Sequence, residues 1–132
     1  MKKIVTTGLA TIMLFALSGI GPAQAHDRIE PTSLTIKVSD KSVDKGDKVT
    51  FKGKLKSDWK KCRANSKVKL VKGSKVVASK TTSANGSYSF KQKIKKTANW
   101  RVKFSGKKVN VTHPHNHRCL GSQSKSIRVR VT

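Results

Sequence analysis

The sequence predicts an all-β protein, a two-sheet antiparallel sandwich of about seven short strands. Apolar residues alternate with Lys, Arg, Ser or Thr in six segments, as in strands with one buried and one exposed face. Turn signals containing glycine separate these segments at regular spacing. With 132 residues, the chain has the length of one domain, which excludes a multidomain enzyme.

The first 25 residues are predicted to be a signal peptide. Lys2 and Lys3 precede an apolar run at 9–17, and Ala23-Gln24-Ala25 is a small-x-small cleavage site. The apolar run is too short to span a bilayer core of about 30 Å permanently. We therefore expect cleavage after Ala25 and a secreted, extracellular protein. Without Lys2 and Lys3, 28 basic residues remain against 6 acidic ones, a net charge of +22.

Residues 26–33 are expected to form an N-terminal lead-in, and residues 34–132 the sandwich domain. The six alternating segments place strands at 34–38, 49–56, 67–70, 88–91, 100–104 and 127–131, and a seventh strand is expected around Val76 and Val77. Turns are expected at 44–47, 72–74, 85–86 and 105–106. The stretches 57–66 and 110–124 show weak patterning and are expected to be loops.

Each weakly patterned stretch contains one of the two cysteines, Cys62 and Cys119. In an exported chain, two cysteines favour a disulfide bond. Closing a loop of this length contributes about 4 kcal/mol in the chain-entropy model. A metal site or a catalytic thiol would need partner residues at fixed spacing, and the sequence offers none.

Three segments carry a resemblance to known modules. Residues 43–53 (VDKGDKVTFKG) resemble the entry to the second strand of bacterial immunoglobulin-like modules. Residues 81–90 (TTSANGSYSF) are similar to a hairpin shared with carboxypeptidase regulatory-like domains, and 100–106 (WRVKFSG) to the strand that follows it. The resemblance implies an immunoglobulin-like β-sandwich and a non-catalytic spacer, adhesion or carbohydrate-associated role. This chain differs in standing alone, in its charge and in its two loop cysteines.

The charge is the strongest functional signal. The electric field of such a basic protein attracts polyanions. The contacts are salt-sensitive and do not recognise a nucleic-acid sequence. We expect anionic cell-surface or extracellular polymers as partners. The alternative is a lysine-rich surface that only keeps the protein soluble, and Lys outnumbers Arg 22 to 6 in the mature chain. The candidate contact residues are Lys52, Lys54, Lys56, Lys60, Lys61, Arg63, Lys91, Lys93, Arg101, Lys103, Arg128 and Arg130.

All four histidines lie in two places, His26 at the expected mature N-terminus and His113, His115 and His117 in one stretch. Alternating imidazoles can converge on Cu²⁺ or Zn²⁺, and an N-terminal His offers its amino group and ring nitrogen together. Copper binding is therefore an alternative function. Apart from Cu²⁺, no cofactor is expected. The competing interpretation is a polar surface loop and a His that cleavage happens to expose.

Catalysis is not expected. Only six acidic residues could form a general acid–base pair, and Asp40, Asp44 and Asp47 are better explained as turn formers. Trp59 is either a ligand-stacking residue or loop packing over the disulfide. A cationic antimicrobial or toxin-like role is a further alternative, compatible with the charge but supported by no motif.

Overall fold

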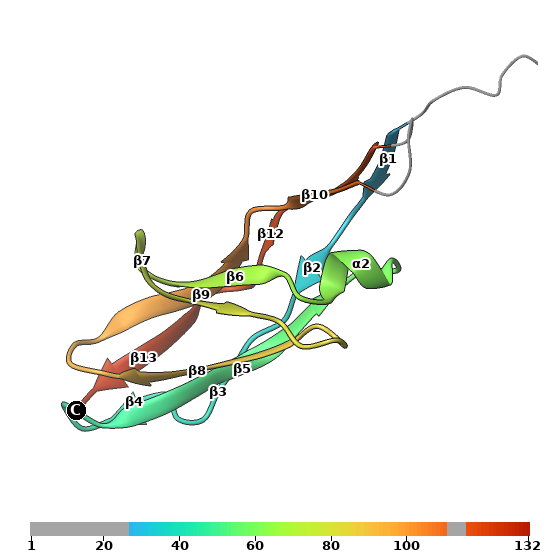
Figure 1. Cartoon of the computed structure of the whole chain (residues 1–132). Coiled ribbons are helices and arrows are strands. Elements are labelled where there is room, and N and C mark those ends of the chain that lie inside the picture. The colour runs from blue at the N-terminus through green and yellow to red at the C-terminus, as the bar shows by residue number, and fades with distance from the viewer. Residues whose placement is uncertain (1–26, 111–115) are drawn as a thin grey trace, which may run out of the picture.

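A computed structural model describes residues 27–110 and 116–132 and shows an all-β fold with one short helix (Figure 1). No helix in these ranges is long and apolar enough to cross a membrane. The predicted signal peptide lies outside them. The elements are β1 Asp27–Glu30, β2 Ser33–Leu34, β3 Lys37–Val38, β4 Ser42–Val43, β5 Lys48–Lys56, α2 Lys60–Arg63, β6 Lys67–Lys72, β7 Lys75–Thr81, β8 Ser87–Lys93, β9 Ala98–Phe104, β10 Lys107–Asn110, β11 Asn116–Cys119, β12 Ser122–Gln123 and β13 Ile127–Val131.

Two sheets form the sandwich, which confirms the predicted fold class. In the first sheet β5 is the central strand. It pairs with β2 and β3 along one edge and with β8 along the other. The second has the order β4-β13-β9-β6-β7, with β12 beside β9. Within these two sheets all pairs are antiparallel except β4 with β13, which are parallel.

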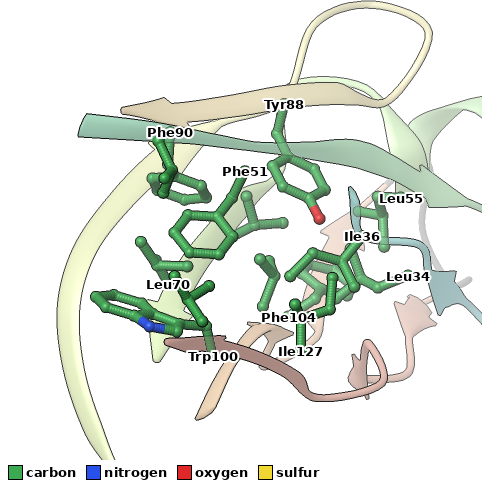
Figure 2. Packing of buried hydrophobic residues seen from close by; sticks show 14 of the residues in the cluster. Leu34, Ile36, Phe51, Leu55, Leu70, Tyr88, Phe90, Trp100, Phe104 and Ile127 are labelled. Atoms are coloured by element: carbon green, nitrogen blue, oxygen red, sulfur yellow. The ribbon is translucent and has the colours of Figure 1, made fainter. Parts of the chain in front are cut away.

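The core fills the space between the two sheets with the apolar residues that the alternation marks as inward (Figure 2). Phe51 and Trp100 come from opposite sheets, and their ring centroids are 5.0 Å apart. Tyr88 is also buried, and its hydroxyl donates a hydrogen bond to the Thr35 carbonyl at 2.5 Å. Burial raises the pKa of Tyr88 well above its usual range. The sandwich thus has a continuous core that includes most of the aromatic residues.

Gly53 lies within β5 where an alternating apolar residue would be expected. A Cβ at this position would lie 2.0 Å from the Thr35 carbonyl oxygen. Only glycine lets the 34–37 segment approach β5 this closely, and that approach positions the Thr35 carbonyl for Tyr88.

A third, small sheet has the order β1-β11-β10, and sequence patterning did not predict it. The expected lead-in at 26–33 contains β1 and the start of β2, and the expected loops contain α2, β11 and β12. The described residues therefore hold more strands than the seven expected. These additional elements are two to four residues long, too short for alternation to show in the sequence.

Candidate functional site

The outward side of the first sheet is a face of exposed lysines, here called the lysine face. On β5 and β8 the apolar residues point into the core, so the intervening residues point to solvent. The same side carries hydroxyl residues such as Thr50 and Ser89, which lie opposite Lys91 and Lys52. The lysine face consists of Lys37, Lys48, Lys52, Lys54, Lys56, Lys91 and Lys93.

Like charges lie directly opposite each other across neighbouring strands of this face. Lys37 is the cross-strand partner of Lys52, and Lys48 is the partner of Lys93. Directly opposed like charges destabilise a sheet by roughly 0.2–1 kcal/mol per pair. The face thus concentrates positive charge where folding alone would disfavour it.

Acidic residues do not neutralise the lysine face. The long strands β5, β6, β7, β8, β9 and β13 contain no Asp or Glu. Across 27–110 and 116–132 the structure shows one ion pair, between Arg28 and Glu30 of β1. Asp44 and Asp47 belong to a turn, where Asp47 Oδ2 accepts the Asp44 backbone N–H at 3.1 Å. Their interpretation as turn formers is confirmed.

The outward side of the second sheet is also basic but partly committed to internal contacts. Arg101 Nε donates to Gln123 Oε1 at 2.6 Å, and its guanidinium also donates to the Gly73 carbonyl at 2.9 Å. Lys103 lies opposite Lys69 and is exposed, as are Arg128 and Arg130. This side faces away from the lysine face, so a single short ligand cannot contact both.

The small sheet is linked to α2 by a disulfide between Cys62 of α2 and Cys119, the last residue of β11. The predicted bridge is confirmed, with 5.6 Å between the two Cα atoms and both residues buried. The Nζ of Lys107 donates to the Ala64 carbonyl at 3.0 Å. Burial lowers the pKa of Lys107 from its usual range.

Trp59 contributes to the same contact between the small sheet and α2. The Arg28 guanidinium lies 5.4 Å from the centroid of the Trp59 ring, and the His117 ring meets it edge-on at 4.9 Å. Trp59 is half-buried. Its position agrees with packing beside the disulfide, the second of its two interpretations.

The twelve predicted polyanion contacts fall into three separate groups. Five lie on the lysine face and four on the outward side of the second sheet, whereas Lys60, Lys61 and Arg63 lie on α2. Arg63 donates to the Ser57 carbonyl at 2.9 Å, so its guanidinium supports the loop. Lys37 and Lys48 also lie on the lysine face but are not among the twelve predicted contacts. Their alternation with Ile36, Val38 and Val49 was the available signal.

Of the four predicted metal ligands, only His117 lies in the described part of the chain. His26, His113 and His115 lie outside it. Among residues 27–110 and 116–132, no group of three or more His, Cys, Asp or Glu side chains could hold a metal ion. The described residues thus do not form a complete metal site.

Comparisons with known proteins identify no family. No protein-family profile matches the chain, and no curated protein is found as a relative. Among solved structures, the sulfur carrier protein SoxY from Chlorobium limicola f thiosulfatophilum is similar over 80% of this chain and 84% of its own, with 17% identity and a TM-score of 0.44. A similarity this distant carries no conclusion about activity.

Proposed function

We propose that this protein is a secreted, non-enzymatic, immunoglobulin-like module that binds anionic polymers at a cell surface or in the medium through its lysine face. The observation that carries the proposal is that all seven lysines of this face are exposed, with Lys37 opposite Lys52, Lys48 opposite Lys93 and no carboxylate on β5 or β8. A bound polyanion would remove the repulsion that these pairs impose. The Cys62–Cys119 bridge supports an oxidising, extracellular compartment.

The binding mechanism is multivalent contact on a rigid sheet. Neighbouring strands lie about 4.8 Å apart, and alternate residues of one strand about 6.8 Å apart. Lys52, Lys54 and Lys56 therefore form a row of three ammonium groups along β5, with Ser and Thr hydroxyls between the lysines of adjacent strands. Flexible lysines reach successive phosphates, sulfates or carboxylates of a chain without selecting one geometry.

The test uses a thymidine homopolymer as a defined single-stranded polyanion. The triple variant Lys52→Ser, Lys54→Ser, Lys56→Ser is compared with Lys67→Ser, Lys80→Ser, Lys125→Ser, which removes the same charge from exposed positions away from the lysine face. The slope of log affinity against log salt should fall by about 2 in the first variant, since each phosphate contact contributes about 0.7.

The control variant should retain most of the wild-type slope. If both triple variants lose the same affinity and the same slope, binding follows net charge alone and the lysine face is not the site. If affinity does not change between low and high salt, the electrostatic mechanism itself is wrong.

Copper binding is a second candidate, favoured by the pairing of β1 with β11. These strands are parallel, and Asp27 is the partner of Asn116 while Arg28 is the partner of His117. In the sequence His26 precedes Asp27 and His115 precedes Asn116. The described residues that follow His26 and His115 in the sequence, Asp27 and Asn116, are therefore direct partners in the small sheet.

Electron paramagnetic resonance during a Cu²⁺ titration tests this candidate on protein that begins at a free His26. One tight type-2 signal, lost when an extra residue caps His26, would support a site that uses the N-terminal amino group. Weak binding that is unaffected by the cap would eliminate this candidate and leave the polyanion proposal intact.

A further inference from the structure

The small sheet has one covered face and one open face. Arg28, Lys107, His117 and Cys119 point toward α2 and Trp59, as their contacts show. The alternate residues point the other way, and one row crosses all three strands, because Ile29 is the partner of Arg118 and Arg118 is the partner of Lys108. The open face thus places an aliphatic side chain beside two cations.

Leu120 lies on the same open face, two residues after Arg118 along the chain. Its backbone N–H donates to the Glu30 carbonyl at 2.9 Å, so the strand pairing continues and Leu120 follows Arg118 on the same side. Leu120, Arg118, Lys108 and Ser105 contribute to the lining of a shallow hollow of about 380 Å³. Ile29, Lys108, Arg118 and Leu120 are here called the tip face.

Two exposed aliphatic residues on one small patch are unusual for this chain. Within the described ranges, the large hydrophobic residues that are exposed are Ile29 at 51%, Val76 at 49% and Leu120 at 41%. Two of these three lie on the tip face, and Val76 lies on β7 of the second sheet. The lysine face, by contrast, presents ammonium and hydroxyl groups.

We propose that the tip face docks the protein on an anionic lipid surface. Ile29 and Leu120 would enter the interface between headgroups and acyl chains, while Lys108 and Arg118 contact lipid phosphates. A soluble polyanion would leave the two aliphatic residues in water. The small sheet projects from the end of the sandwich opposite the C-terminus, so it can reach a membrane without obstruction by the sandwich (Figure 1). This docking is independent of polyanion binding by the lysine face.

The test measures partitioning onto vesicles of equal parts phosphatidylglycerol and phosphatidylcholine by cosedimentation. Ile29→Ser is compared with Val76→Ser, a matched control because the two side chains are similarly exposed. Ile29→Ser should lower the partition coefficient about tenfold because its buried methyl and methylene groups are lost. Val76→Ser should stay within about twofold of the wild type. Equal partitioning of both variants and the wild type overturns the proposal.

Charge and salt separate this inference from polyanion binding. Lys108→Ser, Arg118→Ser should reduce binding to the anionic vesicles, since each cation near such a surface contributes to attraction. Ile29→Ser should leave affinity for the thymidine homopolymer unchanged, whereas the Lys52/Lys54/Lys56 variant should lower it. If wild-type protein binds the homopolymer but not the vesicles, membrane docking is wrong and the lysine face still stands.

Discussion

The sandwich and the small sheet are stabilised in different ways. The sandwich joins two sheets through a shared core that includes Phe51, Phe90 and Trp100. The small sheet has three strands of four residues each, and it meets α2 through the disulfide, the Trp59 contacts and the Lys107 hydrogen bond. The sandwich therefore depends on many apolar contacts, whereas the small sheet combines the packing of Val109 and Cys119 against the core with a few specific contacts to α2.

Removal of the disulfide should have the largest effect on stability, and the small sheet should lose more stability than the sandwich. Cys62→Ala, Cys119→Ala is expected to lower the free energy of unfolding by about 4 kcal/mol, because the bridge closes a loop of 57 residues. Urea unfolding measures the total, and hydrogen exchange should show β10 and β11 losing protection before β5 and β9. Uniform loss of protection would contradict separate stabilisation of the small sheet.

A core truncation tests the sandwich alone. Leu55 is fully buried, and Leu55→Ala should cost about 3 kcal/mol through lost burial and the cavity left behind. The measurement is urea unfolding with the disulfide intact. Val76→Ala provides a control at an exposed position, with an expected change within about 0.5 kcal/mol. A Leu55→Ala cost no larger than that of the control would show that the described core does not stabilise the chain.

Tyr88 gives a smaller, pH-dependent effect within the sandwich. Tyr88→Phe removes the hydrogen bond to the Thr35 carbonyl and should cost about 1 kcal/mol. In the unfolded chain Tyr88 ionises near pH 10, but burial raises its pKa in the folded protein. The folded state therefore keeps its proton longer, and the stability from Tyr88 is complete below about pH 10 and falls above it.

Ultraviolet difference absorbance can follow this ionisation without interference from other tyrosines, since the chain contains one tyrosine. Tyrosinate should form in native protein only well above the pH at which it forms in urea. Coincident titrations in the two conditions would show that Tyr88 is not buried.

The smallest expected effect concerns the charge of the lysine face. Lys52→Ser should raise the free energy of unfolding by up to about 0.5 kcal/mol at low salt, because it removes repulsion by Lys37. Lys54→Ser is the control, since its partner on β8 is Ser87. The difference between the two variants should disappear at 1 M salt. Equal stabilities at low salt would indicate that the opposed lysines do not repel measurably.

Alternation and turn chemistry were sufficient to predict the sandwich. Val49, Phe51 and Leu55 are buried as expected, and the turn residues Gly46, Gly73 and Gly86 have positive φ. These signals are local, so one sequence reveals them. Five of the seven lysines on the lysine face were predicted to point outward for the same reason, because residues between buried positions face solvent.

The small sheet could not be predicted in the same way. β1 and β11 have four residues each and pair across a separation of almost ninety positions, so no local pattern links Arg28 to His117. The two cysteines were the one signal that joined the 57–66 and 110–124 stretches. That signal predicted that Cys62 lies close to Cys119. It did not predict the helix α2 or the small sheet that covers it.

The two parallel strand pairs also constrain when the chain can fold. β1 needs β11 as its partner, and β4 needs β13, so segments near residues 27 and 42 find their partners only near residues 116 and 130. Closing such long loops is slow, and folding of β-rich chains with distant pairing typically takes milliseconds to seconds. In a chain that emerges from a membrane pore N-terminus first, β1 could pair only after β11 has emerged, and β4 only after β13 has emerged. β1 and β4 would meanwhile remain unpaired, whereas the cationic strands β5 and β8, and β6 and β7, can already pair with each other.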